Sequence, residues 1–447
     1  MLNEKLDKYL KKDYYPFHMP GAKRSSILRN DLPYKRDITE IDGFDNLNNP
    51  KEILHDLELS LSNIYNVNES IISTNGSTCG ILASIRSLTY KNKKVLIQRS
   101  CHKAVYNAIE VFNLDVDYID IVTNEINAVI NIDYAGLEKK LNNNCYAAVL
   151  ITSPSYEGYV LDLDKIYEWC KKNNTPLVVD LAHGSHFILE DFYSTAFDIA
   201  ITSFHKNLSG LTPSAGVLIN NKSLAKEIRR NMAIFQTSSP SYVIMQSIDE
   251  MIENFDKFSI LYKDLNKNLN DLYSLELKNL KLIDNIIKDK SKILISTKNT
   301  NINGIILQNL LRKEKIEIEM AYPNYCLLIS TIFDSKKGFE RLKEALISID
   351  KSIYKIENDV KFSYTIPKQA IKISEAILMD SKNVTLSNSL DKISACFVYA
   401  YPPGIPLITP GEFIDNRIID NINQLQSSNV SLNIDKYIRV INWQINL

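Results

Sequence analysis

The chain has 447 residues, of which 45% are hydrophobic and 23% charged, and its formal net charge is −1. Single hydrophobic cores stop growing at roughly 250–300 residues, so this length predicts two or three domains. The balanced charge argues against a nucleic-acid partner, which would require a strongly basic domain. No apolar run approaches the ~20 residues that a membrane span needs, so a membrane is not an expected partner either.

Six cysteines are scattered along the chain without the Cys-x-x-Cys spacing of a zinc site: Cys79, Cys101, Cys145, Cys170, Cys326 and Cys396. We interpret them as free thiols in a reducing compartment. Residues 1–8 lack the apolar stretch of a secretory signal. The expectation is a cytoplasmic protein with neither a disulfide framework nor a metal site.

The predicted elements become regular after residue 50, following a short helix at 2–11 and two polar loops at 15–23 and 37–47. Isoleucine and leucine recur at helical spacing over 52–65. Beyond this helix, short apolar strands alternate with helices; the strands are 70–74, 94–97, 116–119, 147–152, 176–180, 199–201 and 211–219, and the helices are 81–88, 104–112, 164–173 and 223–232. This alternation indicates βαβ units and a mainly parallel sheet, whose ligands bind beyond the carboxyl ends of the strands.

The turn after the first of these strands has the composition of an anion site. Asn75-Gly76 is followed by Ser77 and Thr78, and a helix begins directly afterwards. A helix N-terminus offers unpaired N–H groups and a positive dipole, to which the two hydroxyls would add donors. Serine and threonine are equally common as ordinary helix caps, so both interpretations stay open.

The strongest chemical signal lies on two consecutive strands near the middle of the chain. One strand ends in Asp180, with His183 three residues later, and the next leads to the pair His205-Lys206. A His-Lys pair alone is typical of a surface lysine beside a core histidine, but the upstream Asp-x-x-His turn favours another interpretation. A pyridoxal phosphate (PLP) enzyme needs a lysine that forms a Schiff base with the cofactor and an aspartate that keeps its pyridine nitrogen protonated. The pattern therefore predicts a PLP site.

The sequence pattern of the second half of the chain predicts further helices and strands and a smaller domain that begins near residue 290. A long helix is expected at 242–269. The smaller domain follows with strands at 292–296, 316–320 and 325–329 and helices at 304–313 and 339–347, and the tail carries a helix at 367–379 and a Pro-rich loop at 401–407.

With these residues in view, the chain resembles the Orn/Lys/Arg decarboxylase family of fold-type I PLP enzymes, in particular its short bacterial members without an N-terminal receiver-like domain. The resemblance covers nearly the whole chain. It rests on motifs that occur in the family's order: His18-x-Pro20-Gly21, Thr39-Glu40-Ile41-Asp42-Gly43, Asn75-Gly76-Ser77-Thr78, Cys101-His102-Lys103, Asp180-x-Ala182-His183-Gly184-x-His186-Phe187, Ser203-x-His205-Lys206, Thr237-Ser238-Ser239-Pro240-Ser241 and Tyr401-Pro402-Pro403-Gly404-Ile405-Pro406.

The resemblance implies an α/β fold of the aspartate aminotransferase-like type, with a mainly parallel sheet in the large domain and a smaller α+β C-terminal domain. The implied boundaries are 1–290 for the PLP-binding large domain, 291–355 for the small α+β domain and 356–447 for the family's C-terminal domain. The implied reaction is the PLP-dependent decarboxylation of arginine, lysine or ornithine to the amine and CO₂, a step of polyamine biosynthesis. A homodimer or a higher homo-oligomer is implied as well.

Roles for single residues follow from the same resemblance. Lys206 would form the Schiff base, Asp180 would contact the pyridine nitrogen, and His183 would lie near the phenolic oxygen. His102 would stack on the cofactor ring. The phosphate would be held by a polar set: Ser77, Thr78, Ser203 and His205. For the basic end of the substrate we expect an acidic partner, with Glu412 as the first candidate and Asp45 as a weaker one.

Three departures from the family pattern put the substrate and the activity in question. Ala22 replaces a histidine, Leu181 replaces an acidic residue that often follows the aspartate, and Phe204 replaces a small residue before His205. Two alternatives therefore stay open. One is another fold-type I reaction such as transamination or β-elimination, and the other is a non-catalytic relative that only binds PLP.

Overall fold

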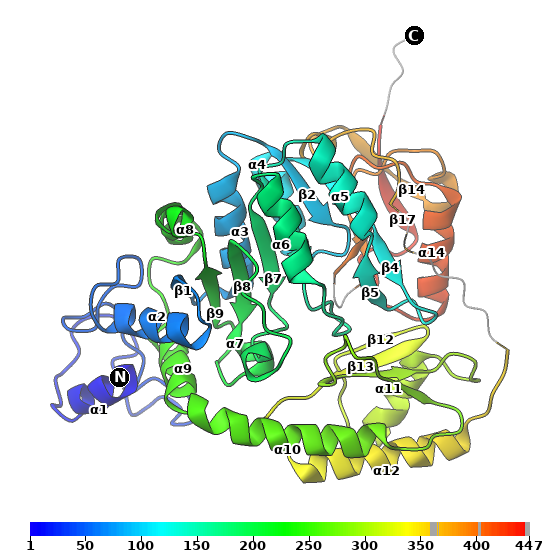
Figure 1. The fold of residues 1–447 in the computed structure, drawn as a ribbon. Coiled ribbons are helices and arrows are strands. Elements are labelled where there is room, and N and C mark those ends of the chain that lie inside the picture. The colour runs from blue at the N-terminus through cyan, green and yellow to red at the C-terminus, as the bar shows by residue number, and fades with distance from the viewer. Residues whose placement is uncertain (358–363, 365, 401–403, 443–447) are drawn as a thin grey trace. The chain divides into compact units, whose positions relative to one another are not determined.

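The computed structural model describes residues 1–357, 364, 366–400 and 404–442, and residues 401–403 of the expected Pro-rich loop lie outside this range. The chain divides into two compact units, each built from two segments that are distant in sequence. The first unit contains residues 1–90 and 163–262, and the second contains residues 91–162 and 263–447. Figure 1 colours the chain by residue number, so each unit combines two colour ranges. The three-domain division expected above stays a prediction.

The first unit combines four strands with helices that cover them. The strands are β1 (Glu69–Ser73), β7 (Leu177–Leu181), β8 (Ile199–Ser203) and β9 (Ala215–Ile219). The helices are α1 (Leu2–Leu10), α2 (Ile53–Ile64), α3 (Gly76–Leu88), α6 (Leu163–Lys172), α7 (Phe204–Asn207), α8 (Lys222–Phe235) and α9 (Tyr242–Glu253), with a short 3₁₀ turn at Phe187–Leu189.

Strand β9 is the antiparallel member of this set. β7 and β8 run parallel, whereas β9 lies between β8 and β1 and is antiparallel to both. Ala215 of β9 is in register with Ser203 on one side and with Ser73 on the other. The carboxyl ends of β1, β7 and β8 therefore meet at one edge, where ligands of open α/β sheets bind.

Helix α3 approaches this sheet closely because of a glycine. A Cβ atom at Gly80 would lie 2.9 Å from a methyl of Val217 and 3.0 Å from a methyl of Ile201. α3 packs in turn against α8, and the two helices lie side by side in Figure 1. This packing fixes the start of α3 at the end of β1.

The second unit contains a parallel run and a separate antiparallel sheet. Its strands are β2 (Lys94–Gln98), β3 (Asp115–Ile119), β4 (Ile121–Thr123), β5 (Val129–Ile132), β6 (Ala148–Thr152), β10 (Lys281–Ile283), β11 (Lys292–Ser296), β12 (Met320–Tyr322), β13 (Tyr325–Ile329), β14 (Ser381–Thr385), β15 (Val398–Tyr399), β16 (Pro406–Ile408) and β17 (Tyr437–Ile441). Its helices are α4 (Lys103–Phe112), α5 (Tyr134–Asn143), α11 (Gly304–Lys313), α12 (Lys336–Ser352), α13 (Ile373–Ala376) and α14 (Asn416–Ser427), with a 3₁₀ turn at Leu386–Asn388. Helix α10 (Phe255–Tyr273) crosses from one unit to the other.

Strand β2 pairs in parallel with β3 on one side and β6 on the other. The four-stranded sheet of order β10-β11-β13-β12 is antiparallel throughout. Together with α11 and α12, it forms the small α+β part that the sequence predicts. The parallel pairs in both units likewise agree with a mainly parallel large sheet, with β9 as the antiparallel exception.

Three predicted elements differ from the observed ones. The expected helix 242–269 is two helices, α9 and α10. The side-chain amide of Asn254 donates to the Glu250 carbonyl and competes there with the backbone hydrogen bonds of the helix. The expected helix 367–379 shrinks to α13, since the N–H groups of Ala370 and Ile371 bond to Gly411 O instead. The expected strand 316–320 is displaced to β12, which turns back into β13.

Candidate active site

Asp180 lies near the carboxyl end of β7 and is buried, with 7% of its surface exposed. Its Oδ1 accepts a hydrogen bond from the N–H of Ala182 at 3.1 Å, which fixes the carboxylate beside the following turn. That turn closes with Gly184 N–H donating to Leu181 O and brings His183 next to the strand end.

Lys206 follows the neighbouring strand, on the short helix α7, and is half-buried. Its Nζ lies 3.1 Å from Nε2 of His183, so an ammonium at this position donates to the imidazole. Asp180 is in register with Ile201 on β8. The structure thus brings the predicted lysine, aspartate and histidine to one edge of the first unit.

Ser203 is the last residue of β8 and carries a buried hydroxyl. The residue is fully buried, and among the described residues its Oγ has no hydrogen-bond partner. Asn207 and Ser214 are buried nearby in sequence, and their side-chain polar atoms are also unpaired within the described part of the chain. Buried polar atoms are normally satisfied, so these orphans fit a polar ligand. The sequence analysis missed Asn207 and Ser214, although Asn207 directly follows the lysine.

His205 is held by its backbone environment. Its Nδ1 lies 2.8 Å from Ser214 O, and because a carbonyl only accepts, Nδ1 carries the hydrogen. Burial lowers the pKa of His205 below its ordinary value of 6.5; the bond to Ser214 opposes this shift and the charge of Lys206 adds to it. The neutral ring therefore leaves Nε2 as an acceptor, and a phosphate at that atom would favour protonation.

Ser77 and Thr78 occupy the first turn of α3, directly after β1, where Ser77 is partly buried and Thr78 is exposed. Asn75 makes no side-chain cap to this helix; its Oδ1 accepts from Thr237 N–H at 3.3 Å instead. Gly76 adopts φ +74, which a residue with a side chain rarely does. This turn therefore lies at the same sheet edge as the end of β8, and Asn75 does not cap its helix.

Phe204, one of the departures from the family pattern, points into the core. It is fully buried, and a Cβ at Gly216 would lie 2.8 Å from its ring, while one at Gly210 would lie 2.9 Å from its Cβ. Gly216 thus makes room for the aromatic ring, whereas Gly210 meets only the Cβ that a smaller residue would also have. Since Phe204 has no exposed surface, it offers no contact to a substrate.

His102 begins helix α4 in the second unit. Its Nδ1 accepts a hydrogen bond from Ala104 N–H at 3.2 Å, which makes it the cap of the helix. The ring is half-buried. Its proposed stacking on the cofactor stays a prediction.

Glu412 is fully buried in the second unit, with 0% of its surface exposed. Its Oε1 lies 2.6 Å from NH1 of Arg99, and its Oε2 accepts from NH2 of Arg99 at 3.0 Å and from Thr409 N–H at 2.7 Å. Both oxygens are therefore occupied, and the side chain has no surface to offer a substrate. These contacts give Glu412 a structural role in the second unit, and its expected role as a substrate contact stays a prediction.

The carboxylate of Asp45 also has its hydrogen-bond partners in the local structure. Its carboxylate accepts from the N–H groups of Lys51, Glu52 and Leu54, which caps the start of α2. Burial raises the pKa of Asp45, but these N–H groups outweigh that effect and hold it below its usual value. Its expected role as a substrate contact stays a prediction.

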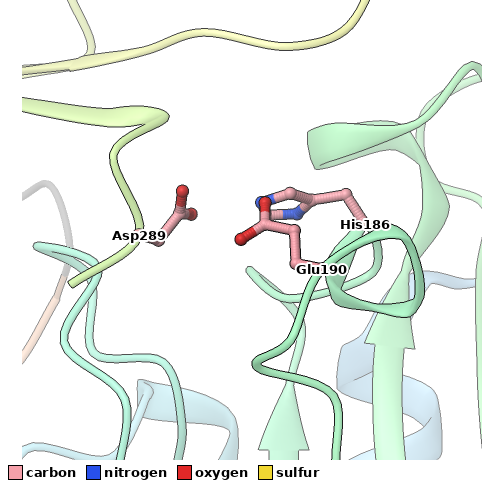
Figure 2. A group of neighbouring side chains, drawn as sticks. All are labelled: His186, Glu190 and Asp289. Carbon is pink, nitrogen blue, oxygen red and sulfur yellow. The ribbon is translucent and has the colours of Figure 1, made fainter. Parts of the chain in front are cut away.

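His186 follows the site turn and forms a separate buried pair. Its Nε2 lies 3.2 Å from Oε1 of Glu190, and Figure 2 shows the two side chains next to each other. Asp289, also drawn there, belongs to the second unit, and no metal site is assigned to these residues.

Comparison with protein families shows the family of this chain. The model described as Orn/Lys/Arg decarboxylase, major domain, matches residues 2–261, and that of the C-terminal domain matches residues 357–432. The chain belongs to the Orn/Lys/Arg decarboxylase family. The sequence-based resemblance is thereby confirmed, and the family's known enzymes are amino-acid decarboxylases.

Relatives in this family align over most of both chains. The arginine decarboxylase of Bacillus subtilis is 26% identical over 453 residues, covering 93% of this chain and 91% of the relative. The arginine decarboxylase of Halalkalibacterium halodurans is 25% identical and covers 89% and 87%. The B. subtilis protein YaaO, described as uncharacterized, is 28% identical and covers 95% and 94%.

Solved structures confirm the fold-type I architecture. The lysine decarboxylase LdcF of Francisella novicida superposes with a TM-score of 0.83 at 18% identity, over 99% of this chain and 81% of that one. A structure described as SPT with PLP gives a TM-score of 0.54 at 15% identity, over 67% and 76%. Enzymes of this fold include PLP-binding ones, and the buried unpaired hydroxyl of Ser203 beside the lysine turn fits such a cofactor.

No helix within the described residues is both long enough and apolar enough to span a membrane.

Proposed function

We propose that this member of the Orn/Lys/Arg decarboxylase family removes the α-carboxylate of a basic amino acid as CO₂ with the help of PLP. One observation carries the proposal: Lys206 Nζ lies 3.1 Å from His183 Nε2, and Lys206 directly follows β8, the strand that pairs with the strand of the buried Asp180. These are the lysine and the acid that PLP chemistry requires, at the sheet edge where the fold binds ligands. The family match supports the reaction class.

When bound, PLP supplies an electron sink for the electron pair that the departing carboxylate leaves behind. Asp180, a buried carboxylate, would contact the ring nitrogen of the cofactor and favour the protonated form of that nitrogen. Lys206 would be the residue that holds the cofactor aldehyde, and its Nζ would hold the proton that the substrate Cα receives after CO₂ has left. His183 accepts the hydrogen bond that orients this Nζ.

The phosphate would be held at the ends of β1 and β8. Ser203 Oγ is available because nothing described in the chain pairs with it, and Ser77 and Thr78 lie in the first turn of α3. His205 Nε2 would complete the set in its protonated form. His102 would stack on the cofactor ring.

The decisive experiment is a competition among substrates. PLP-loaded protein is incubated with arginine, lysine and ornithine together, and mass spectrometry identifies the amine that forms. Agmatine, cadaverine or putrescine would establish the reaction and the substrate at once, and the names of the aligned relatives support arginine as the first to examine. A cofactor spectrum that shifts without amine formation would instead favour transamination or elimination, and absence of both would refute the proposal.

We also propose that the enzyme works as a homodimer in the cytoplasm. Large apolar side chains of the N-terminal segment are exposed: Tyr15 at 71%, Phe17 at 90% and Ile27 at 90%. Such side chains are typical of a surface that a second copy covers. All six cysteines are free, as expected in a reducing compartment. Light scattering after gel filtration tests the dimer, and a monomeric mass at micromolar concentration would contradict it.

A further inference from the structure

Arg99 and Glu412 form a deeply buried ion pair in the second unit. The side chains are 2% and 0% exposed, and two parallel hydrogen bonds of 2.6 and 3.0 Å join them. The guanidinium also lies 4.7 Å from the ring centre of Tyr118. Burial disfavours the charge of Arg99, but Glu412 outweighs this effect and raises the pKa of the guanidinium above its ordinary value.

Glu412 is held rigidly at its own end. Gly411 adopts φ +87, and a Cβ there would lie 2.1 Å from Ile371 O, so only glycine fits. The backbone N–H of Ser394 donates to Glu412 O at 2.9 Å, and Thr409 N–H donates to the carboxylate. The carboxylate is therefore a fixed point of the C-terminal segment.

Arg99 joins this fixed point to the turn between β2 and α4. Its N–H donates to Ile119 O at 3.0 Å, and its own carbonyl accepts from the hydroxyl of Tyr106, on α4, at 2.7 Å. The turn continues with Cys101 N–H donating to Gln98 O. The next residue is His102, whose ring caps α4.

We propose that Glu412, acting through Arg99, is a positioning residue that fixes the β2–α4 turn and thereby the ring of His102. The inference rests on the proposed function, because His102 matters to the reaction only if it contacts PLP. It replaces the substrate contact expected for Glu412 with a role in cofactor binding.

A buried bidentate pair suits this role for a physical reason. Two parallel N–H···O bonds fix both the distance and the plane of the guanidinium, whereas apolar contacts fix neither. Replacing a buried ion pair with apolar residues of similar size is often neutral or stabilising for the fold. Stability and positioning can therefore be separated by experiment.

The test measures PLP binding rather than turnover. The dissociation constant of PLP and the circular dichroism of the bound cofactor are determined for E412Q, for the apolar pair R99M/E412L, for H102A and for E412Q/H102A. We expect E412Q and the apolar pair to weaken PLP binding roughly tenfold or more and to change the cofactor dichroism, because a small displacement of a binding group is costly. E412Q/H102A should bind no more weakly than H102A alone.

Asp350 provides the matched control. It is a buried carboxylate of the same unit that accepts the N–H groups of Lys278, Asn279 and Leu280. D350N should lower the melting temperature without changing the PLP dissociation constant. If E412Q does not fold, the apolar pair carries the test.

Three results would overturn the inference. A folded R99M/E412L variant with wild-type PLP affinity and dichroism would show that the pair positions nothing. Additive losses in E412Q/H102A would show that Glu412 acts by a route other than His102. Unchanged PLP binding by H102A would remove His102 from the cofactor site, a failure of the proposed function that is distinct from a failure at Glu412.

Discussion

Asp180 illustrates how one carboxylate can serve both structure and chemistry. Its Oδ1 accepts the Ala182 N–H, and an asparagine carbonyl could accept the same bond. D180N should therefore keep its fold but lose the buried negative charge, and we expect kcat to fall about 10²–10³-fold. Steady-state kinetics checks this, and a wild-type kcat would contradict the assignment. D198N is the control, because Asp198 is buried just before β8, at the opposite end of that strand, and should lose stability rather than rate.

His205 should make the stability of the cofactor-free protein depend on pH. Its pKa is lowered in the folded state, so the unfolded chain binds the proton first as the pH falls below about 6.5. The folded state is therefore destabilised on the acidic side, and its melting temperature should fall between pH ~7.5 and ~5.5. H205Q should show a smaller fall, which differential scanning fluorimetry would detect. Equal falls in both proteins would mean that another group titrates.

The site residues show which assignments the sequence alone could support. Asp180, His183 and Lys206 were predictable because each lies at or just after a strand end, and parallel strands present those ends at one edge. The partners of Glu412 and Asp45, a distant arginine and the N–H groups at the start of α2, could not be predicted, because the sequence does not show which group a carboxylate contacts. Asn207 and Ser214 were missed because burial of a polar atom is visible only in the folded chain.

At the scale of elements, β9 and α7 depend on each other through Phe204 and Gly216. G216A would place a Cβ 2.8 Å from the Phe204 ring, and such overpacking costs about 1–3 kcal/mol. We expect a lower melting temperature for G216A and recovery when F204L is added. G338A is the control, because a Cβ there meets only Ser335 Oγ, at 3.7 Å. If F204L gives no recovery, the contact is not the cause.

Helices and strands with a clear hydrophobic period and clear boundaries were predicted correctly. Those whose ends depend on tertiary contacts were not. Seven strands between residues 70 and 219 were predicted because short apolar runs alternate with helices, whereas the short strands β4 and β5 were missed. Helix α14 was overlooked although Ile418, Ile422 and Leu425 recur at helical spacing and are buried. The overestimated helix at 367–379 has the right composition, but Gly411, more than thirty residues away in sequence, provides the hydrogen-bond acceptor for its N–H groups.

At the scale of the whole molecule, the six free cysteines predict a distinct pattern of thiol reactivity. Cys145 is exposed, Cys396 is half-buried, and the other four are buried. Burial raises the pKa of Cys79 to about 11 and that of Cys170 to about 12, so their reactive thiolates are scarce. Labelling of the native protein should modify Cys145 first, and denaturation should expose all six. Fast labelling of four or more thiols without denaturant would contradict this arrangement.

The position of β9 affects how the chain folds while the ribosome synthesises it. Among the described strands β1 pairs with β9 alone, so Ile71 and Ile72 have no strand partner until the chain has been synthesised as far as Ile219. At a synthesis rate of ~5–20 residues per second, this wait lasts on the order of ten seconds. An unpaired apolar strand is prone to association with other chains. We therefore expect ribosome-associated chaperones to bind the nascent chain until β9 has emerged from the ribosome.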